Sequence, residues 1–388
     1  MIYADSNATY PVDPSHYDEV ASLLKKMDGN PSSIHANGRN AKVAMEDART
    51  QVAAMLGCRG PEIIFTSGAT EANNMVIQGL IAREGATNSK SAEPPHVIVS
   101  AVEHKAVLDT AALLAERGLC RLDLVPVTSA GDLNIEHLLS LVKPHTALIS
   151  IMHANNEIGM VYPVAQLARL IKDKAPQCHV HVDGVQMLGK ADLTWYGASA
   201  IDSASFSAHK IGGYKGIGAL YLKSGRKLSL FMAGGGQERG RRPGTENIPG
   251  ILSFGLRCAQ LRGQETHLAA SMASVREALI AGLKTIPGLV IHGHAAEMLP
   301  NTVHFHVEGV PGDDLLLNLD LSGIQAGNGS ACSTGVARPS HVVLALGYSE
   351  WVALNSVRLS LSALNTPEDV QAILEVIQQV TVRLKTAD

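Results

Sequence analysis

The sequence predicts an α/β fold, with a large domain built on a mostly parallel sheet and a smaller α+β domain toward the C-terminus. Three observations lead to this prediction. Short apolar runs rich in β-branched residues alternate with longer amphipathic segments, as in strand–helix–strand units. The chain has 388 residues, which is long for one core and predicts two domains. Hydrophobic residues make up 46% and charged residues 18%, so there is enough apolar material for a buried sheet.

The predicted elements of the large domain follow one another in strand–helix order. Residues 62–68 (EIIFTSG) form a strand that enters a turn, and residues 69–85 form a helix. Residues 96–104 (HVIVSAVEH) and 105–118 repeat this order. The further predicted strands are RLDLVPV, ALISIMHA, HVHVDGV, SASFSAH and GALYLKS. Continuous apolar strands separated by helices predict a mostly parallel sheet covered on both faces.

The pattern changes near residues 250–263, where we place the start of the small domain. A clear amphipathic helix covers residues 267–286, and the strands LVIHG and NTVHFHVEG follow it. A last helix runs from Pro367 to about Thr386. We therefore predict a large domain over residues 14–255 and a small domain that consists of residues 256–388 together with residues 1–13.

Composition and charge narrow the class of protein. A net charge of −4 and a pI near 6.5 argue against a dedicated nucleic-acid binder. The apolar runs are strand-sized, so no membrane span is expected, and the N-terminus has no signal or transit pattern. The five cysteines are dispersed without CxxC spacing, which predicts free thiols and no zinc or other metal site. We expect a cytoplasmic protein.

Lys210 is the most informative residue of the chain. It stands between Ser207, His209 and several glycines in the segment SFSAHKIGGYKG. These neighbours indicate a held amine, as needed for a Schiff base with an aldehyde cofactor such as pyridoxal phosphate (PLP). The alternative is an exposed lysine at the mouth of a turn, so the remaining residues must decide.

Polar residues follow several of the predicted strands, where a parallel sheet binds its ligand. Ala69 and Thr70 lie where a strand turns into a helix, which suits a phosphate, although a simple helix N-cap is an alternative. Asp183 ends an apolar strand and could pair with a protonated pyridine nitrogen, and Gln186 could reach the phenolic oxygen. The alternative for Asp183 is a helix cap. His104 could stack on a flat ring and move protons, or be structural.

Three further residues are candidates for the chemistry of a substrate. Asn155 offers an amide to a cofactor oxygen or a substrate carboxylate. Arg358 lies in an apolar strand-like run, where a guanidinium seeks a carboxylate; a structural ion pair is the competing account. Cys332 lies in a loop of small and polar residues, which makes its thiol available for chemistry, unless it is an accidental surface thiol.

In this order the motifs closely resemble those of the cysteine desulfurases, fold-type I PLP enzymes of the class V aminotransferase group. The resemblance covers essentially the whole chain. The matching motifs are NATYPVDP, GNPSSIHANGR, FTSGATEANN, SAVEHKAV, NNEIG, VDGVQMLGK, SFSAHKIGGYKGIGALY, GGGQERGRRPGTEN, GSACSTG and VRLSLS.

The resemblance implies a role for each candidate. Lys210 is similar to the lysine that binds the cofactor, His104 to the ring-stacking acid/base, and Cys332 to the cysteine that accepts sulfur. Further cofactor contacts are implied for Ala69, Thr70, Asp183, Gln186, Ser207 and His209, and substrate-carboxylate contacts for Asn155 and Arg358. Thr245 matches a residue that reaches the phosphate of the neighbouring subunit, which implies a homodimer.

The implied reaction converts L-cysteine to L-alanine. Sulfur passes to Cys332 as a persulfide and then to an acceptor protein that serves iron–sulfur cluster assembly, tRNA thiolation or DNA sulfur modification. No direct contact with nucleic acid or membrane is implied.

The chain departs from the family pattern at a few positions near the cofactor lysine. Tyr10 stands where a threonine is common, and Gly184 where an alanine is common. Gly212 and Tyr214 replace a tyrosine and a proline. These changes remove no catalytic group, but they can alter substrate fit or cofactor retention.

Alternative functions are a selenocysteine lyase and a non-catalytic scaffold that docks sulfur acceptors. Lys105 after the histidine and the GSACSTG form favour a desulfurase over the lyase. A nicotinamide-dependent dehydrogenase is disfavoured because no GxGxxG motif follows the first strand.

Overall fold

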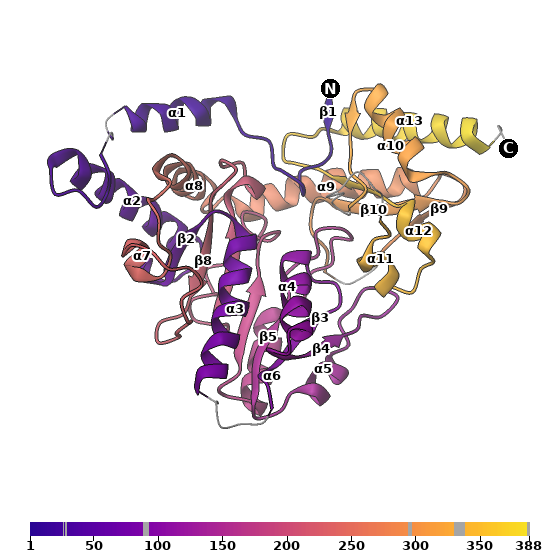
Figure 1. Cartoon of the computed structure of the whole chain (residues 1–388). Helices are drawn as coiled ribbons and strands as arrows, with labels where there is room; N and C mark the ends of the chain where they lie inside the picture. Colours follow the sequence, from indigo (N-terminus) through magenta and orange to yellow (C-terminus); the bar gives the residue numbers. More distant parts are fainter. Residues whose placement is uncertain (26, 28, 88–92, 294–296, 330–337, 386–388) are drawn as a thin grey trace.

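The computed structural model describes residues 1–25, 27, 29–87, 93–293, 297–329 and 338–385. Figure 1 shows a large body around the central sheet and a smaller body at its upper right, where the chain also begins and ends. The predicted α/β fold with a mostly parallel central sheet is confirmed. Cys332, which the sequence predicts as the cysteine that accepts sulfur, lies outside the described residues.

The central sheet has seven strands in the order β2-β8-β7-β6-β5-β3-β4. Its strands are β2 (Ile63–Thr66), β3 (His96–Ser100), β4 (Arg121–Val125), β5 (Thr146–Ser150), β6 (His179–Asp183), β7 (Ser203–Ser207) and β8 (Gly218–Leu222). Neighbouring strands are parallel except where β8 pairs with β2 and β7. β8 runs antiparallel because only a short connection, residues 208–217, returns the chain from the end of β7.

Helices cover both faces of this sheet, and the alternation of side chains along the strands explains why. Ile64, Val97 and Val99 lie in one hydrophobic cluster with α3 (Ala69–Thr87) and α4 (Lys105–Glu116). The residues between them on the same strands, such as Phe65 and Ile98, belong to a second cluster on the other face. That face is covered by α2 (Ala36–Met55), α6 (Val164–Lys174) and α8 (Ile248–Leu261).

The small domain is built on a three-stranded antiparallel sheet with a separate hydrophobic cluster. The sheet order is β12-β10-β9, with β9 (Leu289–Ile291), β10 (Thr302–Val307) and β12 (Val357–Ser360). Its helices are α9 (Glu265–Leu283), α10 (Gly312–Leu321), α12 (Glu350–Leu354) and α13 (Pro367–Lys385). The short helix α11 (His341–Ala345) lies in the same part of the sequence, but its Val342 packs in the cluster of the large domain. Side chains of α9, α10 and α13 pack against this sheet.

The N-terminal segment joins the small domain before it reaches the large one. β1 (Ile2–Tyr3) pairs in parallel with β11 (Ile324–Gln325), and Asp5 forms a bridge with Ser360. The chain then continues to α1 (Pro14–Leu24), which precedes α2. The segment therefore crosses between the domains at residues 5–13.

The boundary that we placed after residue 255 falls inside α8. This helix is continuous, and Ile251, Phe254 and Leu261 all pack in the second cluster of the large domain. The packing changes along α9, where Leu268 contacts the large-domain cluster and Leu279 lies in the small-domain cluster. α9 therefore links the two cores.

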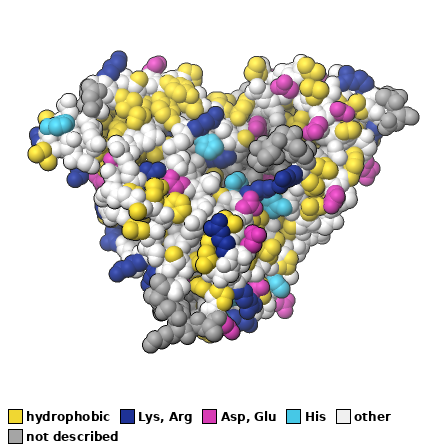
Figure 2. All heavy atoms as spheres, in the orientation of Figure 1, with side chains coloured by type: hydrophobic (Ala, Val, Ile, Leu, Met, Phe, Trp, Pro, Cys, Tyr) yellow, Lys and Arg dark blue, Asp and Glu magenta, His cyan; other side chains and the backbone are white. Residues whose placement is uncertain are grey.

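The remaining short elements are η1 (Gly60–Glu62), α5 (Ile135–Leu141), η2 (Ala208–Lys210) and α7 (Gln237–Gly240). None of the helices in the described part of the chain is long and apolar enough to span a membrane. On the face drawn in Figure 2, cationic and anionic side chains are interspersed, which agrees with the small net charge.

Candidate active site

A cavity of about 690 Å³ lies at the carboxyl end of the central sheet. The segments that follow β2, β3, β6 and β7 form most of its wall, as expected for an α/β sheet. The N-terminal segment contributes Asp5, Asn7, Ala8 and Thr9, and the small domain contributes Arg358 and residues 327–329. The cavity therefore collects residues that are far apart in the sequence.

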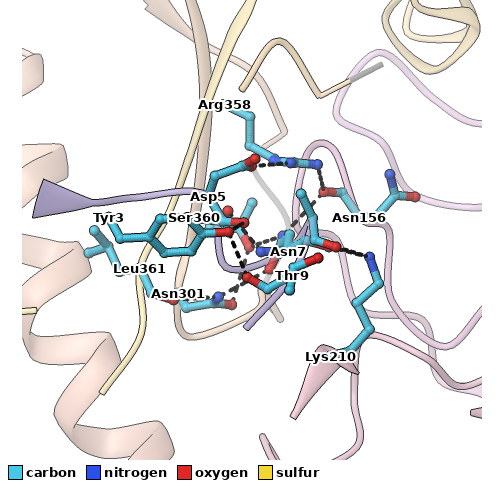
Figure 3. A network of polar contacts seen from close by, with 12 residues as sticks. Tyr3, Asp5, Asn7, Thr9, Asn156, Lys210, Asn301, Arg358, Ser360 and Leu361 are labelled. Atoms are coloured by element: carbon cyan, nitrogen blue, oxygen red, sulfur yellow. Dashed lines mark hydrogen bonds and ion pairs between the residues drawn. The ribbon is translucent and has the colours of Figure 1, made fainter. Parts of the chain in front are cut away.

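Lys210 reaches this cavity from η2, directly after β7. Its Nζ donates hydrogen bonds to the backbone carbonyls of Asn7 (2.6 Å) and Ala8 (2.8 Å). Figure 3 shows the amine directed at the N-terminal segment. Burial lowers the pKa of Lys210 to about 8, and the charge of Arg358 adds to this effect while Asp183 and Asp5 oppose it. The amine is held in place and is easier to deprotonate than an ordinary lysine.

The bend behind Lys210 is where this chain departs from the family pattern. Gly212 has φ +87°, and a Cβ there would lie 3.0 Å from the carbonyl oxygen of Pro11. The left-handed conformation and this contact explain why glycine suits the position. The ring of Tyr214 stacks on Tyr17 at 5.4 Å between centroids, away from the amine.

Several groups that can bind an anion line the cavity. Ala69 and Thr70 line it at the start of α3, where the first N–H groups of a helix have no intrahelical partner and carry partial positive charge. Ser207 and His209 line the cavity beside them. Burial lowers the pKa of His209 to about 4, and Lys210 adds to this effect, so the ring is neutral. Its Nδ1 lies 3.2 Å from Thr9 Oγ1.

Asp183 presents a buried carboxylate to the cavity without a cationic partner among the described residues. Its oxygens accept hydrogen bonds from Asn73 Nδ2 (2.8 Å) and from the backbone N–H of Val185 (3.2 Å). His181 Nε2 lies 2.8 Å from Asn73 Oδ1, which orients the Asn73 amide. A buried carboxylate of this kind calls for a positive group in the cavity.

His104 lies on the cavity wall at the start of α4. Its Nδ1 accepts a hydrogen bond from the backbone N–H of Ala106 (3.1 Å), so the proton of the neutral ring is on Nε2. Burial lowers the pKa of His104, against the opposing charge of Asp183. A flat, neutral imidazole therefore faces the cavity.

Arg358 marks the small-domain side of the cavity. Its Nη1 donates to the carbonyl of Asn156 (2.9 Å), and its Nη2 forms an ion pair with Asp5 Oδ1 (2.5 Å). Figure 3 shows the guanidinium between these two groups. Nε is buried and has no hydrogen-bond partner among the described residues. The structural ion pair is therefore present, and it uses only part of the donor capacity of the guanidinium, which has five N–H groups.

The structure does not bring every predicted site residue to the cavity. The Asn155 amide is fully buried, donating to Val102 O (3.0 Å) and accepting from the N–H groups of Glu157 (2.8 Å) and Ile158 (3.0 Å). Its neighbours Ala154 and Asn156 line the cavity, and Asn155 does not. Thr245 is exposed and lies outside this chain's cavity.

Sequence reasoning missed the residues that hold the others in place. Asn7 begins the quoted NATYPVDP motif and Asp5 lies two residues before it, but only the pairing of β1 with β11 brings them to the cavity. Asn73 and Lys190 lie inside the quoted FTSGATEANN and VDGVQMLGK motifs. A buried polar side chain next to a candidate residue was the available signal.

These residues fit PLP. The cavity holds an oriented amine for an aldehyde, a helix N-terminus with Ser207 for a phosphate, and the unpaired Asp183 carboxylate for a protonated ring nitrogen. A Cβ at Gly218 would lie 2.7 Å from Gly68 Cα, so only a glycine there leaves room for the turn that begins α3.

Comparisons with known proteins agree with this chemistry. The family described as aminotransferase class-V matches residues 2–373. The chain is 35% identical to "Cysteine desulfurase IscS 1" of Archaeoglobus fulgidus, over 100% of this chain and 98% of that protein. It is 38% identical to "Cysteine desulfurase IscS" of Methanosarcina thermophila, over 99% of this chain and 93% of that protein.

Solved structures give the same result. A NifS-like protein superposes with a TM-score of 0.90 at 35% identity, covering 98% of this chain and 99% of that one. "SspA in complex with cysteine" superposes with a TM-score of 0.80 at 29% identity, covering 94% and 100%.

Proposed function

The chain belongs to the class-V aminotransferase family and is a PLP-dependent cysteine desulfurase, and from that premise we propose a role for each residue of its cavity. The observation that carries the proposal is that one cavity joins the Lys210 amine, the unpaired Asp183 carboxylate and the Arg358 guanidinium. An amine, an acid and a guanidinium at these places suit a cofactor aldehyde, its ring nitrogen and the carboxylate of an amino acid.

Different residues of the cavity would bind different groups of PLP. Thr70, Ser207 and His209 would hold the phosphate together with the first N–H groups of α3 at Ala69. Asp183 would keep the ring nitrogen protonated, and Gln186 would donate to the phenolic oxygen. Bound in this way, PLP supplies an electron-withdrawing ring that acidifies the α-carbon of an amino acid.

Lys210 and His104 would carry the proton transfers. Lys210 would hold the cofactor through its aldehyde and would take the α-proton of the substrate, because its lowered pKa leaves a usable fraction of neutral amine near pH 8. His104 lines the cavity and can hold a proton at Nε2. Arg358 would bind the substrate carboxylate, with Asp5 holding the guanidinium.

We propose Cys332 as the sulfur acceptor on the strength of the GSACSTG motif. Its thiolate would attack the substrate sulfur, so that a sulfur–sulfur bond forms as the carbon–sulfur bond breaks. The electron pair left on carbon takes up a proton, which yields L-alanine. The enzyme persulfide would then pass its sulfur to an acceptor protein for iron–sulfur cluster assembly, tRNA thiolation or DNA sulfur modification.

The test measures two products of the reaction with L-cysteine. Wild-type protein should release L-alanine and gain one sulfur atom on Cys332, detected by mass spectrometry of the alkylated peptide. Cys332→Ala should retain the cofactor colour but form no persulfide. Persulfide formation and full turnover by Cys332→Ala would overturn the assignment of the acceptor cysteine. Trapping the recipient of the persulfide sulfur then identifies the pathway.

A further inference from the structure

Lys190 is a buried lysine next to the cavity for which the reaction gives no role. It is 6% exposed. Its Nζ donates to Gln186 Oε1 (3.1 Å) and to Asn7 Oδ1 (3.1 Å). No carboxylate forms an ion pair with it among the described residues. Burying a lysine without a counter-charge is unfavourable, so its presence calls for an explanation.

The surroundings of Lys190 favour an uncharged amine. Burial, together with the positive charges of Lys210 and Arg358, lowers its pKa to about 7. A small cavity of about 20 Å³ is bordered by both Lys190 and Lys210, and Arg257 also borders it. The charged groups that face Lys190 are therefore cations. A neutral amine has two N–H donors, and the structure provides two acceptors.

The contact with Gln186 decides which end of that amide faces the cavity. The carbonyl of Asn7 can only accept, and it takes a hydrogen bond from Gln186 Nε2 (3.1 Å). Gln186 Oε1 therefore points to Lys190 and accepts from its Nζ (3.1 Å). A glutamine held this way presents a donor to the cavity that it lines. Without Lys190 the amide could turn over and present an acceptor.

The contact with Asn7 reaches Lys210 through one residue. Lys190 and Asn301 (3.1 Å) both donate to Asn7 Oδ1, and Asn7 Nδ2 donates to Thr302 Oγ1 (2.8 Å). The backbone carbonyl of the same Asn7 accepts from Lys210. Figure 3 shows Asn7 at the centre of this network, between Lys210 and Asn301. Fixing the Asn7 side chain therefore also fixes an acceptor of the Lys210 amine.

We propose that Lys190 is a positioning residue of the active site: its amine orients the Gln186 amide toward the cofactor and holds Asn7 against Lys210. This inference rests on the proposed roles of Gln186 and Lys210. Lys190 touches neither cofactor nor substrate in this scheme and acts through those two residues.

The test compares Lys190→Met with a control in holoenzyme. Methionine keeps the length and burial of the side chain but removes both donors. Lys172→Met is the matched control. Lys172 is also a largely buried lysine; it lies on α6, pairs with Asp202 (2.5 Å) and does not line the cavity. The readouts are the pH midpoint at which the absorbance of the bound cofactor titrates, the dissociation constant of PLP, and kcat and KM for L-cysteine.

We expect Lys190→Met to raise the absorbance midpoint by about 0.5–1 pH unit and to weaken PLP binding about tenfold, because a donor to the phenolic oxygen is no longer held. The substitution should lower kcat and change KM less. Lys172→Met should lose stability without moving the midpoint. A midpoint in Lys190→Met equal to wild type would overturn the inference and leave Lys190 a packing residue.

Lys190→Gln keeps the test decisive if the methionine variant does not fold. Glutamine supplies two N–H donors and carries no charge, so it should retain the wild-type midpoint. A clear shift in a folded Lys190→Gln protein would contradict a role for the neutral donors. Failure of the proposed function is distinguishable, since wild-type protein itself would then lack the cofactor absorbance or release no L-alanine.

Discussion

At the scale of single residues, the site depends on amines and acids whose charge is set by their neighbours. Lys210 has two backbone acceptors and two nearby acids, but burial and Arg358 dominate, so its pKa falls to about 8. Asp183 lines the same cavity and has no ion-pair partner among the described residues. The pair is suited to hold an aldehyde and a ring nitrogen, respectively.

The lowered pKa of Lys210 predicts how cofactor-free protein takes up PLP. Only the neutral amine attacks the aldehyde, and below its pKa the neutral fraction falls about tenfold per pH unit. The rate of uptake, followed by absorbance, should therefore rise about tenfold between pH 6 and 7 and level off above about pH 8. A rate that keeps rising to pH 10 would show that Lys210 has an ordinary pKa.

The sequence was sufficient to predict most residues of the site, but it was only partly sufficient to predict the contacts of their side chains. Lys210, His104, Asp183 and Arg358 follow apolar strands or lie in them, and all four line the cavity. Asn155 stands in an equally suggestive NNEIG motif, yet its amide turns inward and bonds to the backbone. A motif fixes the residue type and the approximate place, whereas the direction of a side chain depends on the local turn.

At the scale of elements, the short connections after the strands carry the site, and distant elements brace them. Arg49 on α2 forms a two-pronged ion pair with Glu238 (2.7 and 2.8 Å), and both side chains are buried. Glu238 also accepts from the backbone N–H of Phe65 on β2 (2.9 Å). Glu238 and Arg239 have positive φ angles of 48° and 59°. The ion pair therefore holds a strained turn against the sheet.

Breaking this ion pair should be costly. Arg49→Met leaves the Glu238 carboxylate buried and unpaired, so the free energy of unfolding should fall by about 3–5 kcal/mol. Arg121→Ala is the control, since Arg121 pairs with Asp123 at the surface, and its loss should change stability by less than about 1 kcal/mol. Equal denaturant midpoints for the two variants would contradict the bracing role of Arg49.

The strands of the sheet could be predicted from the sequence, whereas some helices and the direction of β8 could not. Apolar runs identified all seven strands. Six of them are almost entirely buried, and only Val125 is buried in the edge strand β4. α1 and α2 were not predicted, since the buried face of α2 consists largely of alanines, which give a weak hydrophobic pattern. The antiparallel direction of β8 depends on the length of the connection after β7.

At the scale of the whole molecule, the site exists because the N-terminal segment spans both domains. β1 pairs with β11 of the small domain, and residues 5–9 then line the cavity in the large one. In this segment Asn7 accepts a hydrogen bond from Lys210, and Asp5 forms the ion pair with Arg358. Lys210 is the proposed cofactor lysine and Arg358 the proposed binder of the substrate carboxylate. No local pattern reveals such a contact, because it joins residues about 200 and 350 positions apart.

The proposed homodimer predicts complementation between two damaged chains. Thr245 is exposed and lies outside the cavity of its own chain, as expected if it serves the partner's phosphate. Mixing Lys210→Ala with Thr245→Ala chains should restore activity, because a mixed dimer holds one site with intact Lys210 and an intact Thr245 from the other chain. Homodimers of either variant are the controls. A monomer in light scattering, or no recovery on mixing, would contradict shared sites.

The most direct test of the account is to locate the cofactor on the chain. Reducing the PLP-loaded protein with borohydride fixes the bond between cofactor and lysine, and peptide mass spectrometry then identifies the residue. We expect a single modified lysine, Lys210, and an unmodified Lys190, with no modification in Lys210→Ala. Modification of Lys190 or of another lysine in wild-type protein would contradict the assignment of Lys210.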